Sequence, residues 1–159
     1  MLANDNAVSA RDEYLSFRLG EEEYAIDILR VQEIRAREPI TRIANTPAFM
    51  RGVINLRGTI VPIVDLRIKF GMVEAANDSY PVTIILNIGR HVIGMVVDAV
   101  SDVVALKPGE LRPAPALSGA VEAACIRGLA PIDGRMLIVV DIARLMTTGD
   151  FAFAEEAAA

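Results

Sequence analysis

The feature that most constrains this chain is an internal repeat of its strand pattern. The segment GTIVPIVDLRIKF, which begins at Gly58, aligns without a gap with GRMLIVVDIARLM, which begins at Gly134, 76 residues later. An earlier pair, LGEEEYAIDILRVQEI from Leu19 and IGRHVIGMVVDAVSDV from Ile88, aligns at a spacing of 69 residues. Similarities this weak can arise by chance, but two ungapped blocks in the same order favour a duplication.

The repeat units, at about 15–70 and 82–146, share one order of predicted elements: strand, turn, strand, connection, strand, turn, strand and short helix. Alternating apolar residues, as in LSFRL, indicate half-buried strands. Runs such as VTIILNI are apolar on both faces and must be covered on both sides. Because barrel closure removes exposed strand edges, we predict a mostly β fold of two small barrels packed around a shared hydrophobic core.

Capping signals predict short helices between the strands. Asp65 and Asp141 follow apolar strands at equivalent positions, and both fit helix N-caps better than a pair of catalytic carboxylates. In NTPAFMRG, Thr46 fits an N-cap and Gly52 fits the exit of a helical turn.

Length and composition predict one folded domain. We expect residues 1–12 to form a flexible leader, 13–147 the domain, with interleaved or sequential barrels, and 148–159 a C-terminal tail. No apolar stretch reaches the ~20 residues that span a bilayer, and the N-terminus lacks the apolar core of a signal peptide. A single cysteine excludes an internal disulfide. These observations predict a soluble cytoplasmic protein.

The supply of catalytic and metal-binding side chains is small. His91 is the only histidine and is expected in an exposed hairpin turn, and Cys125 is expected to be a buried apolar residue. One histidine and one cysteine cannot build a zinc site, and no calcium loop or phosphate-binding glycine loop occurs. We therefore expect no catalytic residue, no metal site and no cofactor.

Charge and aromatic content bear on nucleic-acid binding. The net charge is −5 and aromatic residues make up 5% of the chain. A small-barrel nucleic-acid binder needs a basic groove and stacking aromatics, so this alternative is disfavoured.

One polar turn interrupts the apolar strands. In NLRG, Arg57 occupies a hairpin turn where small polar residues are usual. It is either a solvent-exposed arginine or an anchor for a partner, since arginine is enriched among binding hot spots. The segment RVQEI supplies a second candidate at a barrel edge, with Val31, Glu33 and Ile34. A binding module is therefore the predicted class of function.

Three segments closely resemble the CheW family of bacterial chemotaxis coupling proteins: EEYAIDILRVQEIRA, TRIANTPAFMRGVINLRGTIVPIVDLRIKF and GMVVDAVSDVVALKPGELRPAP. The resemblance runs from about Leu15 to Met146. It implies two five-stranded SH3-like β-barrels flanking a hydrophobic core, and no enzymatic activity. It also implies an adaptor that links the cytoplasmic tips of chemoreceptors to the regulatory domain of the histidine kinase CheA, in arrays that control the kinase.

The resemblance also implies binding residues. Receptor contact is expected at Val31, Glu33, Ile34, Asn55 and Arg57, with Asn55 shaping the turn. Partner binding or coupling is expected to involve Gly52, Gly94, Val100 and Val103.

The same resemblance bears on the oligomeric state, the location and the pathway of the protein. The isolated protein is expected to be a monomer, recruited to membrane-bound receptor arrays without inserting into the membrane. A chemosensory pathway other than flagellar chemotaxis, such as pilus-based motility, stays open because the sequence does not separate the two.

Overall fold

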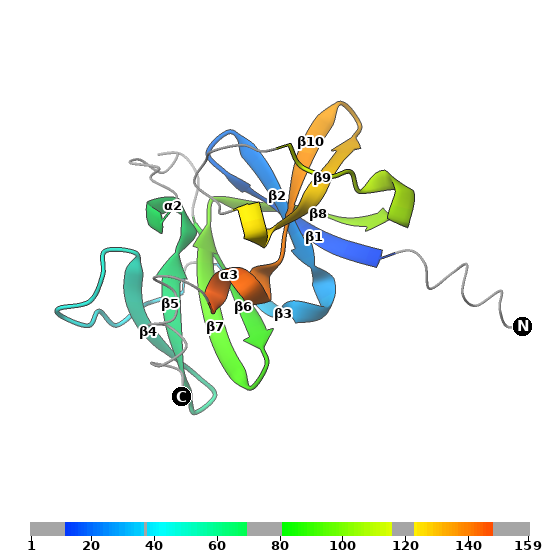
Figure 1. The fold of residues 1–159 in the computed structure, drawn as a ribbon. Helices are drawn as coiled ribbons and strands as arrows, with labels where there is room; N and C mark the ends of the chain where they lie inside the picture. The colour runs from blue at the N-terminus through cyan, green and yellow to red at the C-terminus, as the bar shows by residue number, and fades with distance from the viewer. Residues whose placement is uncertain (1–11, 37, 70–80, 116–122, 148–159) are drawn as a thin grey trace, which may run out of the picture.

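The computed structural model describes residues 12–36, 38–69, 81–115 and 123–147 (Figure 1). The expected leader, apart from Asp12, and the expected tail lie outside these residues. The first half contains β1 (Asp12–Leu19), β2 (Glu22–Asp27), β3 (Val31–Ala36), β4 (Met50–Leu56) and β5 (Thr59–Asp65). The second half contains β6 (Val82–Ile88), β7 (His91–Val97), β8 (Ala99–Leu106), β9 (Ile126–Ile132) and β10 (Arg135–Val140).

Short helices follow or connect these strands. The α-helices are α2 (Leu66–Lys69) and α3 (Ile142–Met146). The 3₁₀ turns are η1 (Ile28–Arg30), η2 (Pro108–Glu110) and η3 (Ala123–Cys125). None of the helices in the described ranges is long and apolar enough to cross a membrane.

The strands form two five-stranded sheets. Sheet A has the order β8-β1-β2-β10-β9, and sheet B has the order β3-β6-β7-β5-β4. Sheet B therefore uses five consecutive strands, whereas sheet A combines the first two strands with the last three. The pairs β10–β2 and β5–β7 are parallel, and the other pairs are antiparallel. Figure 1 shows the sheets on either side of α3. The predicted mostly β fold with two five-stranded units is confirmed.

A backbone bridge joins the two outer edges of each sheet. Thr41, downstream of edge strand β3, exchanges two backbone hydrogen bonds of 2.9 Å with Val53 on the opposite edge strand β4. Arg112, downstream of edge strand β8, exchanges two of 2.8 Å with Leu129 on β9. These bridges bring the edges of each sheet together, which is how a barrel avoids exposed edges.

The two halves have equivalent backbone interactions. The backbone N–H of Asp65 donates to the carbonyl of Phe49, and that of Asp141 donates to Cys125, both at 2.7 Å and 76 residues apart. Each strand of the first half corresponds to the strand five places later in the second half, so that β1 corresponds to β6 and β5 to β10. If every strand of sheet A is exchanged for its counterpart, the strand order becomes that of sheet B. This equivalence supports the predicted duplication, which stays an inference about origin.

Apolar residues from both sheets form one shared core. The largest cluster joins Phe17 and Ile26 of sheet A to Ile84 and Met95 of sheet B, with Leu145 of α3 also packed in it. Each such side chain contributes about 1.5–3 kcal/mol when fully buried. The core therefore lies between the sheets and includes residues of α3.

In the predicted helical turn at NTPAFMRG, a single turn forms, in which the backbone N–H of Met50 donates to the carbonyl of Pro47 at 2.9 Å. The predicted cap and exit of that turn are wrong. The Thr46 hydroxyl donates to the carbonyl of Ile43 at 3.0 Å, and β4 already begins at Met50. Gly52 lies inside β4 at a bulge, with a φ of +141°. A Cβ there would lie 2.0 Å from the carbonyl oxygen of Thr41. Glycine is therefore required by the bridge that closes sheet B, not by a helix exit.

The two predicted N-caps differ in what they bind. The Asp141 carboxylate accepts from the backbone N–H of Arg144 at 3.1 Å, which confirms it as the cap of α3. Asp65 accepts from the backbone N–H of Arg67 at 2.9 Å, but its carboxylate is fully buried and also binds arginine side chains. Asp65 therefore has a role beyond capping.

Candidate functional site

The residues expected to contact a receptor meet at one end of sheet B. Val31, Glu33 and Ile34 lie on edge strand β3, and Asn55 and Arg57 lie on the β4–β5 hairpin. These strands are at opposite edges of the sheet order, yet Arg57 and Glu33 form an ion pair. Closure of the sheet thus brings the two segments together, and we call these five residues the sheet B tip.

The hairpin turn holds Arg57 in an uncommon backbone conformation. Arg57 and Gly58 have φ values of +51° and +92°, in a two-residue turn between the paired residues Leu56 and Thr59. Positive φ at both positions is typical of a type I′ turn, whose twist matches that of the strands. The Asn55 side chain oxygen accepts from the backbone N–H of Gly58 at 2.8 Å. Asn55 therefore stabilises the turn that presents Arg57.

Charge at the sheet B tip is held in place by hydrogen bonds. Arg57 donates to both carboxylate oxygens of Glu33, and Arg35 donates to one of them at 3.0 Å. The bond from Arg57 is the main reason that the pKa of Glu33 falls to about 2. The same bond raises the pKa of Arg57. The Arg57 side chain remains 64% exposed, so an ordered cation stays accessible.

Apolar residues flank this ion pair along the chain. Ile34 on β3 and Ile60 on β5 are exposed, although they belong to well-formed strands. Val31 is half-buried and packs against the shared core, so it supports the tip more than it presents a surface. Ile60 was not predicted, because β5 is apolar on both faces and its pattern does not indicate which residues extend into solvent.

The second group of expected residues does not form one site. Gly52 and Gly94 are buried in sheet B, whereas Val100 and Val103 lie on β8, an edge strand of sheet A. A Cβ on Gly94 would lie 2.4 Å from Cδ1 of Ile63, so this glycine makes room for a core side chain. Val100 packs against the shared core. Of the four, Val103 is the one exposed to solvent.

Sheet A has a surface equivalent to the sheet B tip. Its residues lie 69 or 76 positions after Glu33, Ile34 and Arg57 of the sheet B tip and after neighbouring Ile60. We call them the sheet A tip: Asp102, Val103, Asp133 and Met136. Val103 and Met136 are exposed, as their counterparts are. Asp133 has a φ of +49°, close to the +51° of Arg57. Met136 was not predicted, because its counterpart Ile60 was not predicted either.

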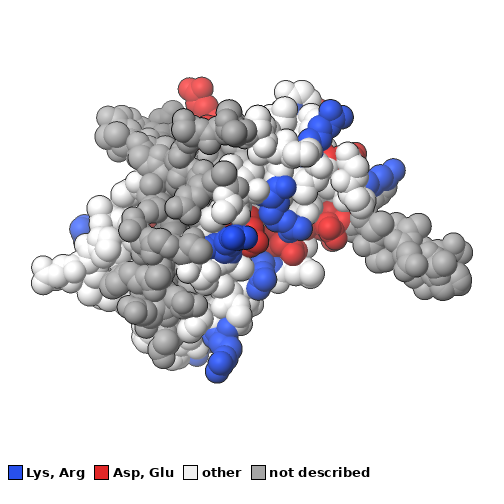
Figure 2. Space-filling model, in the orientation of Figure 1, with Lys and Arg blue, Asp and Glu red and all other residues white. Residues whose placement is uncertain are grey.

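The described residues offer little for catalysis. No group of three or more His, Cys, Asp or Glu among them could hold a metal ion. Cys125 is buried, as predicted, and His91 is a half-buried first residue of β7 rather than part of an exposed turn. Figure 2 shows basic and acidic side chains interspersed on one face, rather than an extended basic surface.

Comparisons with known proteins agree on one family. A family model described as "CheW-like domain" matches residues 13–149. The chain is 49% identical over 146 residues to the chemotaxis protein CheW of Klebsiella aerogenes, covering 92% of this chain and 88% of that protein. It is 38% identical over 135 residues to the probable chemotaxis protein CheW of Rhizobium etli, covering 85% and 87%. The crystal structure of the scaffolding protein TtCheW from Thermoanaerobacter tengcongensis superposes with a TM-score of 0.76 at 33% identity, covering 87% and 90%.

Proposed function

This chain belongs to the CheW family and is a non-enzymatic scaffold that couples chemoreceptors to the histidine kinase CheA; from this premise we propose that the sheet B tip binds the receptor. The observation that carries the proposal is the state of Arg57. Its guanidinium is ordered by Glu33 and by the turn, yet it is mostly exposed. A planar cation with five donors and fixed geometry suits polar recognition of a protein partner.

The chemistry of the sheet B tip fits the cytoplasmic tip of a receptor, a helical hairpin. The hydrogen bonds to Glu33 leave other N–H donors of the Arg57 guanidinium available for carbonyl or carboxylate oxygens of a partner. Exposed Ile34 and Ile60 offer apolar area to one face of a helix, a common mode of helix recognition. A recruited protein needs no membrane-spanning helix, so this contact would hold the scaffold in the cytoplasm beneath the membrane-bound receptors.

The sheet A tip is our proposed contact for the regulatory domain of CheA. It has exposed Val103 and Met136, and Asp133 stands at the turn position that Arg57 occupies in the sheet B tip. Its other acidic residue, Asp102, lies 4.0 Å from the guanidinium of Arg135. Separate surfaces on separate sheets would allow both partners to bind at once, as a coupling protein requires. We propose that the isolated chain is a monomer, and the pathway it serves stays open between flagellar chemotaxis and another chemosensory system.

The experiment is reconstitution of receptor fragments, CheA and this protein, with kinase autophosphorylation as the readout. Arg57→Ala should lower receptor binding about tenfold and reduce kinase control, because truncation of an interface arginine commonly costs more than 1 kcal/mol. Arg112→Ala, which removes an exposed arginine from sheet A, is the matched control and should have no effect. Normal ternary complexes with Arg57→Ala would remove the sheet B tip from the receptor interface.

A further inference from the structure

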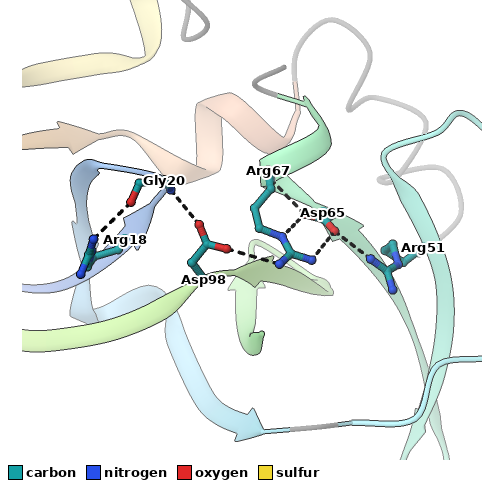
Figure 3. A network of polar contacts seen from close by, with 6 residues as sticks. All are labelled: Arg18, Gly20, Arg51, Asp65, Arg67 and Asp98. Atoms are coloured by element: carbon teal, nitrogen blue, oxygen red, sulfur yellow. Dashed lines mark hydrogen bonds and ion pairs between the residues drawn. The ribbon is translucent and has the colours of Figure 1, made fainter. Parts of the chain in front are cut away.

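Three charged side chains form a buried cluster where the two sheets meet (Figure 3). The Arg67 guanidinium donates from Nε and Nη2 to the two carboxylate oxygens of Asp65, at 3.0 and 2.9 Å. It also donates from Nη1 to Oδ1 of Asp98 at 3.3 Å. All three residues are buried, and the bonds to Asp65 raise the pKa of Arg67.

The cluster connects elements of different sheets. Asp65 ends β5 of sheet B, and Arg51 on neighbouring β4 donates to its Oδ2 at 2.9 Å. Asp98 lies between β7 and β8, where the chain leaves sheet B and enters sheet A. Its Oδ2 accepts from the backbone N–H of Gly20, in the β1–β2 turn of sheet A, at 2.7 Å. A continuous series of hydrogen bonds therefore runs from β4 of sheet B to the β1–β2 hairpin of sheet A.

The fold does not require this cluster at both crossovers between the sheets. The positions equivalent to Asp65, Arg67 and Asp98 in the other half are Asp141, Ala143 and Leu29. Leu29 is exposed in η1, the crossover from β2 to β3, and the Asp141 carboxylate caps α3. The equivalent crossover therefore forms without a buried Arg–Asp pair.

Stability alone does not explain a buried cluster of this kind. Desolvation of the charges offsets most of their attraction, and apolar replacements of similar volume are often neutral or stabilising. Packing between apolar faces is non-directional, whereas these hydrogen bonds are directional and tolerate little displacement. The property that the cluster adds is a defined geometry between the two sheets.

We propose that Asp65, Arg67 and Asp98 act as a clamp that sets the relative orientation of the two sheets, and that this orientation is required for coupling between partners on the two tips. The three residues are positioning residues, since all three are buried. The second part of the proposal rests on the proposed function, and the first part does not.

The test uses a double variant, Arg67→Met with Asp98→Leu. It removes one positive and one negative charge together, and it leaves Asp65 paired with Arg51. Backbone residual dipolar couplings measure the orientation of each sheet in solution. In the wild-type protein, couplings from both sheets should fit one alignment tensor. In the double variant, each sheet should fit its own tensor and the joint fit should fail.

Two controls separate the clamp from stability and from partner binding. Arg51→Gln removes the exposed partner of Asp65 and should keep a single tensor. Arg57→Ala should also keep a single tensor while it weakens receptor binding, so failure of the proposed function is distinguishable from failure of the clamp. If the double variant does not fold, Asp98→Asn replaces it, because one amide oxygen cannot satisfy both Arg67 and Gly20.

The functional readout is kinase control in the reconstituted complex. The double variant should bind receptor fragment alone and CheA alone within about threefold of wild type. The factor by which the bound receptor fragment changes CheA in the complex should fall about tenfold. A single wild-type tensor in the folded variant would overturn the clamp. Separate tensors with unchanged coupling would overturn the requirement for a fixed orientation.

Discussion

The two tips share a backbone and differ in charge. Arg57-Gly58 and Asp133-Gly134 both form turns with positive φ, at +51° and +92° in one and +49° and +78° in the other. One tip presents a cation held by Glu33, whereas the other presents Asp133. The repeated backbone therefore determines where a surface lies, and the side chains determine what it can bind.

The interiors of the two sheets show the same relation between equivalent positions. Gly94 lies opposite Ile63 in sheet B, and Ala25 lies opposite Val139 in sheet A. Ile63 is one carbon larger than its counterpart Val139, and Gly94 is one carbon smaller than its counterpart Ala25. The two sheets thus fill the same space with different combinations. Four experiments, ordered by expected effect, test how far the equivalence extends.

The largest effect is expected at the glycines that face the closing bridges. A Cβ would lie 2.0 Å from the Thr41 carbonyl oxygen at Gly52, and 2.6 Å from that of Arg112 at Gly128. Gly52 alone of the two has a positive φ, at +141°. Gly52→Ala should therefore destabilise the protein by about 3 kcal/mol or more in urea unfolding, and Gly128→Ala by less. Equal losses would mean that backbone conformation adds nothing to the clash.

A charge on β8 should distinguish a core-facing residue from an exposed one. Val100 packs against the shared core, and so does its counterpart Val31. Val100→Asp and Val31→Asp should each cost about 2 kcal/mol, because a carboxylate loses water there without a partner. Val103→Asp should leave the melting midpoint unchanged and weaken CheA binding. An unchanged midpoint for Val100→Asp would contradict its placement against the core.

A smaller effect is expected from exchange of the interior pairs. Gly94→Ala should cost about 1–2 kcal/mol, since its new methyl group meets Cδ1 of Ile63 in a filled core. Ile63→Val removes that atom, so the double variant recreates the combination of sheet A and should recover most of the loss. Unfolding free energies of the single and double variants give the coupling. Strictly additive losses of unfolding free energy would show that positions 63 and 94 are not coupled, and that the combination found in sheet A does not fit sheet B.

The smallest effect concerns the titration of Glu33. In the folded protein its pKa is about 2, below the ordinary 4.5, chiefly because of the bond from Arg57. In Arg57→Ala, the carboxyl resonance of Glu33 should titrate closer to 4.5, and in Arg35→Ala it should move less. A lowered folded pKa stabilises above the unfolded pKa, so this contribution is present above pH 4.5 and is lost as the pH falls toward 2. An identical midpoint in Arg57→Ala would show that the pair does not persist in solution.

Local patterns in the sequence predicted the features that nearby residues determine, such as strands and a helix cap. The alternation in LSFRL and the repeat spacing correctly indicated strands, the two sheets and Asp141 as a cap. The prediction of Gly52 as a helix exit was wrong because a tertiary bridge to Thr41, absent from any local pattern, determines that backbone. The pairing of Arg67 with Asp98 was missed for the same reason.

Prediction of the candidate surface had a similar limit. The polar turn identified Arg57 because a long cation is unusual between apolar strands. Exposure of Ile60 and Met136 depends on where each strand extends beyond its neighbours, and single-strand patterns carry no such information.

The strand order has a consequence for synthesis of the chain. Sheet B consists of consecutive strands between residues 31 and 97, so its last strand leaves the ribosome before β8, β9 and β10 do. Until then, β1 and β2 have only each other, and a lone hairpin is marginally stable in water. The nascent chain therefore passes through a stage with one finished sheet and an N-terminal hairpin that lacks its neighbours, the stage at which chaperones would be needed most.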